Sequence, residues 1–277
     1  MLGKLIKHEW KRLWKVPTVL LALLLALAVG TGLTFSRPVL ESEAVGLDIV
    51  MVISGLIWIT FFIALVGISF AITIYLALQF YKSMYSDEGY LTHTLPVTSV
   101  QLLTSKGLVV SIWTVLCSLG IILSILIAGS MAVHSFPEMD WQTMWMEIQT
   151  EWQELLIALE MEGVNMSQLI VPGIIGIVIS VFYGTALIIG SLTIGQLARK
   201  HRIAFSFLAG IVISWLVSAL QSIIQIPISF QLTFNQSLGI FPYMVGSLWI
   251  QDILYAIVTV VLFIVSNNII KNRLNLE

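Results

Sequence analysis

Charged residues are scarce in this chain of 277 residues. Asp, Glu, Lys and Arg make up 10% of it, against about a quarter in soluble globular proteins, whereas hydrophobic residues make up 58% and the mean hydropathy is +0.99. The one cysteine, Cys117, excludes an internal disulfide and a multi-cysteine metal site. The sequence also lacks the short alternating segments of a transmembrane β-barrel. The composition therefore predicts an all-α membrane protein with several spans.

The motifs of common enzyme classes are missing too. There is no P-loop, no G-x-S-x-G elbow and no HExxH, and the histidines (His8, His93, His134, His201) are scattered along the chain. Secondary transporters carry repeats, broken helices and midplane ionisable groups, of which only Asp252 gives a hint. We therefore expect no catalytic residues, no metal and no cofactor bound by this chain, so energy for transport would come from another chain.

Six apolar runs reach or exceed the roughly 20 residues that a helix needs to cross a bilayer. They cover about 16–35, 49–79, 107–132, 169–197, 203–226 and 247–266. The second run is longer than the hydrocarbon core is thick, so it must tilt or protrude just before Phe80. The first run is too long for the apolar part of a signal peptide, which favours a retained first span.

Lys and Arg alternate between the two sides of these spans. Along the seven segments outside the runs they number 5, 1, 2, 0, 3, 0 and 2, so twelve of the 13 fall on one side and Arg37 alone on the other. Cytoplasmic loops carry the Lys and Arg excess. Both termini, the interval 80–106 and the turn 199–202 are therefore predicted to be cytoplasmic. Seven of the 15 acidic residues lie in the opposite, outer loop at 134–168.

Two polar segments on the predicted inner side carry internal patterns. Residues 2–15 alternate basic and apolar side chains as in an amphipathic helix on the inner leaflet, with Trp10, Trp14, Lys7 and Lys11 on it. This helix either anchors the topology or couples motion.

The second segment is the interval 80–106, FYKSMYSDEGYLTHTLPVTSVQLLTSK. In it Ser86 and Asp87 can cap a short helix that Pro96 ends, and Thr98 or Ser99 can cap the next one. A docking element is favoured over a plain cytoplasmic loop.

Other polar features lie towards the outer side and inside the spans. Trp and Glu recur at helical spacing in 134–168, which favours an acidic amphipathic helix on the outer leaflet over a role in substrate release. Small residues at four-residue intervals predict a helix–helix contact at Gly176, Ser180 and Gly184. A polar stripe in the fifth run either joins helices or lines a path, and Asp252 either belongs to that path or reaches outer water. The candidate path residues are Ser214, Ser218, Gln221, Ser222, Gln225 and Asp252.

The basic first helix, the six spans and the string SDEGYLTHTLP followed by LLTSK resemble the membrane subunit of ABC-2-type exporters. The likeness is to small permeases of Gram-positive bacteria, among them exporters of phenol-soluble modulins and bacteriocins. It implies a multi-pass permease of the bacterial cell membrane that pairs with a second copy or a paralogue. Two separate ATP-binding cassette subunits would hold ATP and Mg²⁺ and drive export of an amphipathic or hydrophobic substrate such as a peptide. Lipids, and no nucleic acid, complete the expected partners.

The resemblance also implies roles for particular residues. Residues 2–15 would be the elbow helix, 87–95 the coupling helix and 227–245 a re-entrant segment. The residues that would dock on the ATPase are Ser86, Asp87, Glu88, Gly89, Tyr90, Leu91, His93 and Leu95, with a second contact at Arg199, Lys200, His201 and Arg202. Two alternatives stay open: an ion-coupled transporter that uses Asp252, and a scaffold or immunity protein that transports nothing.

Overall fold

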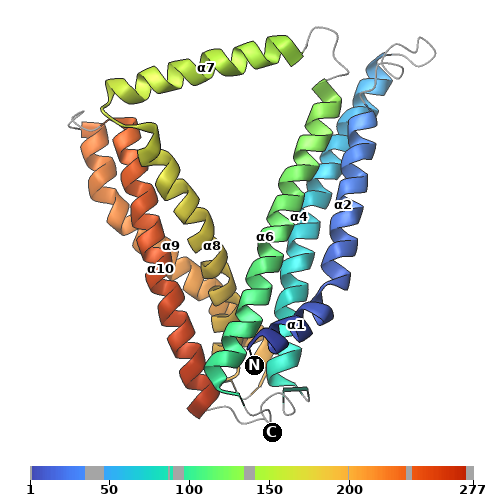
Figure 1. The fold of residues 1–277 in the computed structure, drawn as a ribbon, viewed down its shortest axis with the longest axis vertical. Coiled ribbons are helices and arrows are strands. Elements are labelled where there is room, and N and C mark those ends of the chain that lie inside the picture. Colours follow the sequence, from blue (N-terminus) through green and yellow to red (C-terminus); the bar gives the residue numbers. More distant parts are fainter. Residues whose placement is uncertain are drawn as a thin grey trace. The chain divides into compact units, whose positions relative to one another are not determined.

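The chain folds into helices throughout the part that the structure describes. This computed structural model describes residues 2–34, 47–86, 88–89, 97–133, 141–198, 200–234 and 239–272, and these contain no strand. The helices are α1 (Leu2–Leu13), α2 (Lys15–Leu33), α4 (Leu47–Tyr85), α6 (Ser99–Val133), α7 (Trp141–Met161), α8 (Met166–Gly195), α9 (Arg202–Phe234) and α10 (Ile240–Asn272) (Figure 1). The predicted all-α fold class is confirmed.

Six helices among the described residues are long and apolar enough to cross a membrane. These are Lys15–Leu33, Val52–Tyr85, Ser99–Met131, Met166–Gly195, Arg202–Pro227 and Ile240–Asn272. Their large apolar side chains are widely exposed, for example Phe207 at 73% and Ile63 at 67%, as expected when lipid rather than protein covers a helix. The chain is therefore a multi-pass membrane protein.

Several helices extend beyond the apolar runs from which they were predicted. The helix α4 has 39 residues, which makes it about 58 Å long. Residues 227–234 continue α9 through Pro227, and residues 240–245 already belong to α10. The stretch 227–245, for which the resemblance implied a re-entrant segment, therefore forms no helix of its own in its described part.

The helix predicted in the loop 134–168 is α7. Its Trp145 and Trp152 are 60% and 47% exposed, and the acidic side chains of Glu147, Glu151 and Glu154 are exposed as well. Both the aromatic and the acidic side chains of α7 are thus open to the surroundings.

The described chain divides into two compact units. One contains residues 10–76 and 112–152, and the other contains residues 1–9, 77–111 and 153–277, so that α4 and α6 contribute to both. In the unit 10–76/112–152, α2 packs along α6 in the same direction at two glycines. A Cβ atom at Gly120 would lie 2.7 Å from Leu21, and one at Gly32 would lie 2.6 Å from Met131. Small residues thus set the distance between these helices.

The other unit is built on α8, α9 and α10. The helices α8 and α10 run parallel, with Tyr183 stacked on Tyr255 at a centroid distance of 4.2 Å. A Cβ atom at Gly190 would lie 3.0 Å from Leu262. The helix α9 runs back beside α8, and the two approach most closely where Gly195 meets Ser206.

The Gly195–Ser206 contact leaves no room for a methyl group. A Cβ atom at Gly195 would lie 2.7 Å from the Ser206 Cα atom, which is backbone and cannot rotate away. We expect Gly195→Ala to lower the free energy of unfolding by about 1–3 kcal/mol through overpacking. The matched control is Gly184→Ala in the same helix, where no atom lies within 4 Å of the added Cβ. Thermal unfolding in detergent would measure both, and equal melting temperatures would contradict this packing.

Candidate functional site at the helix ends beside the polar interval

Helix ends on both sides of the polar interval 80–106 share one buried cluster. The last turns of α4 and the first turns of α6 pack against α8 and α10. We call this group the end cluster, and its buried members are Phe80, Met84, Tyr85, Leu102, Leu103, Ile189 and Ile270. The chain therefore both enters and leaves the polar interval from fixed positions.

Hydrogen bonds reinforce the end cluster from both sides. The Tyr85 hydroxyl lies 2.7 Å from the hydroxyl of Thr193 in α8, and both side chains are buried. The Ser99 hydroxyl donates to the Asn267 side-chain oxygen of α10 at 2.9 Å. Buried hydroxyls need such partners, because an unpaired one costs about 1–3 kcal/mol. The end of α4 is thus tied to α8, and the start of α6 to α10.

The start of α6 has the local signals of a helix N-terminus. The backbone N–H of Gln101 donates to the Thr98 hydroxyl, and the N–H of Thr98 donates to the Gln101 side-chain oxygen, each at 3.3 Å. This reciprocal arrangement is a capping box. It confirms Thr98 as one of the two caps that the sequence allowed.

Three of the eight predicted docking residues lie within the described part. The Ser86 hydroxyl donates to the Lys82 carbonyl at 2.5 Å, and the Gly89 N–H donates to the Ser86 carbonyl at 2.6 Å. A Cβ atom at Gly89 would lie 2.5 Å from the Met84 carbonyl oxygen, so only glycine allows this approach. Glu88 is exposed. The other five, which are Asp87, Tyr90, Leu91, His93 and Leu95, lie outside the described residues.

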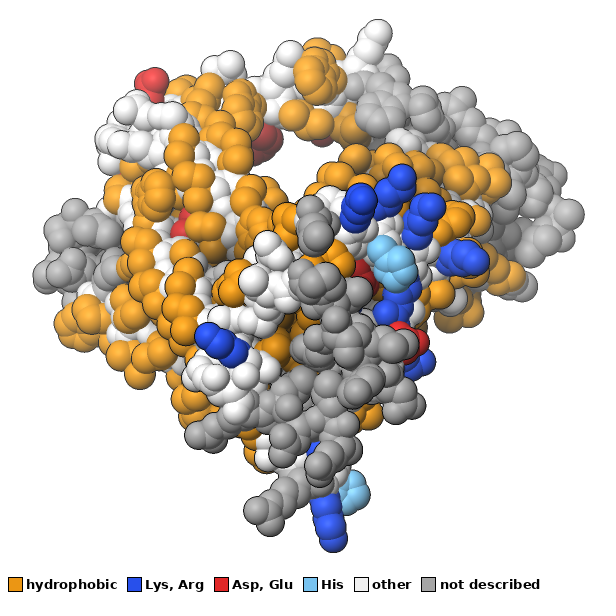
Figure 2. All heavy atoms as spheres, turned by 60° about the horizontal axis from the view of Figure 1, so that its bottom comes forward, with side chains coloured by type: hydrophobic (Ala, Val, Ile, Leu, Met, Phe, Trp, Pro, Cys, Tyr) orange, Lys and Arg blue, Asp and Glu red, His pale blue; other side chains and the backbone are white. Residues whose placement is uncertain are grey.

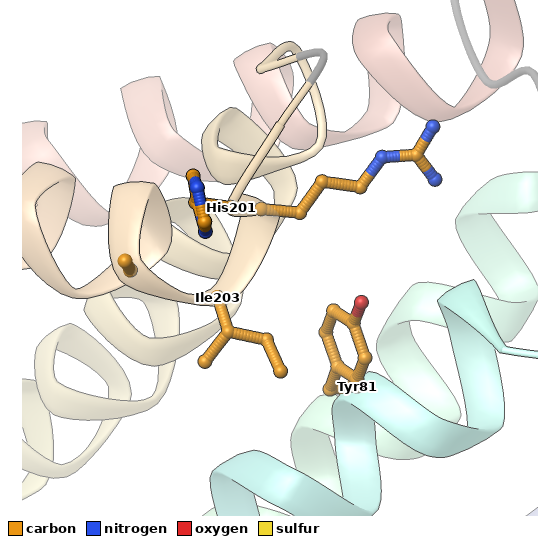
Figure 3. Close-up of a pocket in the computed structure, with 5 residues that line it drawn as sticks. Tyr81, His201 and Ile203 are labelled. Carbon is orange, nitrogen blue, oxygen red and sulfur yellow. The ribbon is translucent and has the colours of Figure 1, made fainter.

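The end of α4 and the start of α9 line one pocket of about 660 Å³. Tyr81 comes from α4, and the other lining residues form the stretch 201–204, in which Ile203 points towards Tyr81 (Figure 3). His201 adopts a positive φ of 56°, and its carbonyl accepts the N–H of Phe205 at 3.0 Å to begin α9. The structure thus brings part of the predicted second contact, His201 and Arg202, next to the exit of α4. Lys200 is exposed, and Arg199 lies outside the described residues.

The N-terminal helix α1 carries the predicted basic face. Lys7 and Lys11 are exposed. Figure 2 shows several Lys and Arg side chains gathered on one part of the face that it draws. Trp10 stacks on Trp113 of α6 at a centroid distance of 4.9 Å. Trp14 is 46% exposed. Of the two tryptophans predicted on this helix, Trp10 thus packs against the protein and Trp14 is exposed.

A buried ion pair joins α1 to α6, and sequence reasoning missed it. The Lys106 ammonium group contacts the Glu9 carboxylate, and the two side chains are only 3% and 14% exposed. Glu9 is the one acidic residue among the basic residues of segment 2–15, and Lys106 stands inside a long apolar helix. Two isolated charges of opposite sign in such surroundings are a signal for pairing, because a buried charge requires a partner.

Asp252 is buried inside the α8–α10 contact. Its side chain is 3% exposed, its Oδ1 atom would lie 2.7 Å from a Cβ atom at Gly176, and its Oδ2 atom has no hydrogen-bond partner. It lies twelve residues after the start of α10, which is about 18 Å along the helix. The Asp252 side chain therefore lies in the contact between α8 and α10 and not on the exposed surface of α10.

Two serines of the polar stripe of α9 donate hydrogen bonds within their own helix. Ser214 and Ser222 donate to backbone carbonyls one turn back, at 2.8 and 2.9 Å, and Ser218 and Ser222 are exposed. Gln221 alone is seen to reach α10, where its amide lies 3.4 Å from the side-chain oxygen of Gln251. Gln225 is half-buried. Of the predicted path residues in α9, Gln221 thus lies beside Gln251, which directly precedes Asp252 in the sequence.

The three predicted packing residues of α8 behave differently from one another. Gly176 lies against Asp252, whereas Ser180 is exposed and no atom lies within 4 Å of a Cβ atom built at Gly184. The close contact of α8 at Gly195 was not among the predictions. Its partner, Ser206, lies in the next helix, so spacing within one helix could not reveal it.

Comparisons with known proteins add no relative. No family model, no curated protein and no solved structure matches the chain. Among the described residues, no group of three or more His, Cys, Asp or Glu side chains could hold a metal ion.

Loss of the Glu9–Lys106 pair should destabilise the protein strongly. We expect Lys106→Met to lower the free energy of unfolding by about 3–5 kcal/mol, because it leaves the Glu9 carboxylate buried without its cation. Lys4→Met removes an exposed lysine from α1 and should change stability by less than about 0.5 kcal/mol. Thermal unfolding in detergent measures both variants. The swapped pair Glu9→Lys/Lys106→Glu should recover part of the loss, and equal melting temperatures for the two Met variants would refute the role of the pair.

Proposed function

We propose that the chain is the membrane-spanning permease subunit of an ATP-binding cassette exporter, and that the polar interval 80–106 docks on a separate ATPase subunit. The observation that carries this proposal is the end cluster. Both ends of the interval are packed against α8 and α10. A displacement of the interval by an ATPase would therefore move α8 and α10 as well, instead of being lost in a loose loop.

The charge distribution supports a cytoplasmic position for the interval. Twelve of the 13 Lys and Arg residues fall on the side that contains both termini, 80–106 and 199–202. In this orientation α1 lies along the inner leaflet, where its lysines meet anionic headgroups. Its ion pair with Lys106 then links a membrane-surface helix to the segment that leaves the interval.

The ATPase subunit would make two contacts with the chain. The first is the interval itself, with Asp87 and Glu88 among its docking residues. The second is the pocket of Tyr81 and the stretch 201–204, in which Arg202 and His201 suit an acidic side chain of the partner. The chain has no nucleotide-binding motif, so ATP and Mg²⁺ would be held by two such partner subunits.

The complete exporter would contain two permease chains in a bacterial cell membrane. The second chain would be either another copy or a paralogue. The substrate class that fits a permease of this composition is an amphipathic or hydrophobic molecule, in particular a peptide.

Charge reversal in the interval tests the docking. We expect Asp87→Lys/Glu88→Lys to weaken binding of the ATPase subunit by about tenfold or more, because a like charge against a complementary surface costs at least about 1.4 kcal/mol. The matched control is Glu147→Lys/Glu151→Lys, which reverses two exposed carboxylates of α7. The measurements are the ATPase subunit retained on the purified chain and the rate of ATP hydrolysis. Undiminished retention and hydrolysis in the interval variant would refute the docking.

Ion-coupled transport is a second candidate function, and one observation favours it. Asp252 is a buried carboxylate with an unpartnered oxygen inside a membrane-spanning helix, and such groups mark ion and proton paths. Proteoliposomes separate the two functions. The exporter moves substrate with the ATPase and ATP in the absence of an ion gradient, whereas the ion-coupled transporter needs only the gradient and stops in Asp252→Asn. If substrate is transported under neither condition, both transport functions are refuted and a scaffold function is favoured.

A further inference from the structure

A second pocket lies where α8 and α10 begin. It has a volume of about 620 Å³, and its walls include the apolar side chains of Val171, Pro172, Val245 and Trp249. The polar groups on it come from the turn between α7 and α8 and from the first turn of α8, chiefly Glu162. It is thus an apolar pocket with a carboxylate at one edge.

The turn between α7 and α8 fixes the position of Glu162. Gly163 adopts a positive φ of 70° and donates its N–H to the Glu160 carbonyl at 3.0 Å, and Val164 donates to the Leu159 carbonyl at 2.9 Å. These two bonds form a Schellman motif, and the side chains of Leu159 and Val164 are buried as that motif requires. Glu162 is therefore held on an ordered turn.

The Glu162 carboxylate caps the N-terminus of α10. Its Oε2 atom accepts the backbone N–H of Phe241 at 2.8 Å, and a Cβ atom at Gly239 would collide with it. The positive end of the α10 dipole is thus already paired with this carboxylate. A ligand in the pocket meets a fixed carboxylate rather than an open helix N-terminus.

A second carboxylate lies near the pocket on α10 but does not line it. Asp252 follows the lining residue Trp249 by three positions, about 4.5 Å further along α10, and its buried Oδ2 atom has no hydrogen-bond partner. An acceptor group without a donor therefore lies about one helical turn past the pocket.

No positive charge is supplied by the chain in this region. None of the lining residues is basic, and the sequence contains no Lys or Arg between Lys106 and Arg199. Seven acidic residues lie in the same stretch, at 134–168. A cationic group approaching the pocket is thus attracted and an anionic one repelled.

We infer that this pocket binds the cationic, amphipathic segment of a peptide. A Lys or Arg side chain of the peptide pairs with the Glu162 carboxylate at the edge of the pocket. The apolar side chains of the peptide lie on Val171, Val245 and Trp249, and the Trp249 ring also attracts a cation. The inference rests on the proposed function only for the statement that this peptide is the exported substrate.

Binding can be measured without any ATPase. The chain is placed in lipid nanodiscs, and the probe is a fluorescently labelled amphipathic helical peptide of about 20 residues with lysines on its polar face. A second peptide carries Glu at each Lys position. Fluorescence anisotropy gives the two dissociation constants. We expect the cationic peptide to bind at least about tenfold more tightly than the anionic one.

Two variants alter the pocket in independent ways. Glu162→Gln removes the charge but keeps an oxygen that accepts the Phe241 N–H, and Gly246→Leu fills the pocket with an apolar side chain from a position whose Cβ has no atom within 4 Å. Each variant should raise the dissociation constant of the cationic peptide by about tenfold. The controls are Glu160→Gln, an exposed neighbour on α7, and Gly67→Leu, an exposed glycine of α4, and both should keep the original affinity.

Equal affinity for the two peptides, or unchanged affinity in both pocket variants, overturns the inference. A melting temperature for each variant shows whether it is folded. If Glu162→Gln does not fold, the affinity of Gly246→Leu for the cationic peptide decides the test. If the peptide does not bind but the ATPase subunit still docks, the proposed substrate class is refuted and the proposed permease function stands. If the peptide binds but no ATPase subunit docks, the peptide pocket stands and the proposed permease function is refuted.

Discussion

The hydrogen bond between Tyr85 and Thr193 closes a cluster on which the proposed action of this protein depends. Without fixed ends, a polar stretch between two spans would move independently of the helices around it. Here the residues before and after the stretch are buried against α8 and α10, and the hydroxyl groups of Tyr85 and Ser99 are paired across helices. The positions of the two ends of the interval are therefore set by the membrane-spanning helices themselves.

The lipid surroundings explain why only a few side chains hold the helices together. In a bilayer the apolar surfaces of α4, α8 or α9 gain little from contacting one another, so close packing and paired polar groups must hold the helices together. The close contacts occur at glycines: Gly120 and Gly32 between α2 and α6, and Gly190 and Gly195 on α8. The paired polar groups include Glu9 with Lys106. Single substitutions at these few positions should lower the stability of the protein most.

Much of the fold was predictable because spanning length is a property of local sequence. The six spans could be recognised from apolar runs of about 20 residues or more. The continuation of α9 through Pro227 to Phe234 was not predicted, because proline and the following polar residues suggested an end. Proline is tolerated inside a spanning helix where other groups satisfy the backbone carbonyl that it leaves free.

The contacts within the sites were predictable only where both partners lie close in sequence. Thr98 and Gln101 form a capping box three residues apart, and the sequence allowed this cap. Glu162 and Phe241, or Gly176 and Asp252, are separated by 79 and 76 positions, and only the fold brings them together. The Glu9–Lys106 pair, 97 positions apart, was missed for the same reason, although two isolated opposite charges in apolar surroundings could have suggested it.

The most direct test of the account is the accessibility of the polar interval in cells. With Cys117 replaced by serine, single cysteines at Glu88 and Glu160 are treated with a membrane-impermeant maleimide, in intact cells and in inverted vesicles, with and without the ATPase subunit. We expect Glu88→Cys to react only in inverted vesicles and to be shielded by the ATPase subunit, whereas Glu160→Cys should react in intact cells. Labelling of Glu88→Cys from outside the cell, or no shielding by the ATPase subunit, would contradict this expectation.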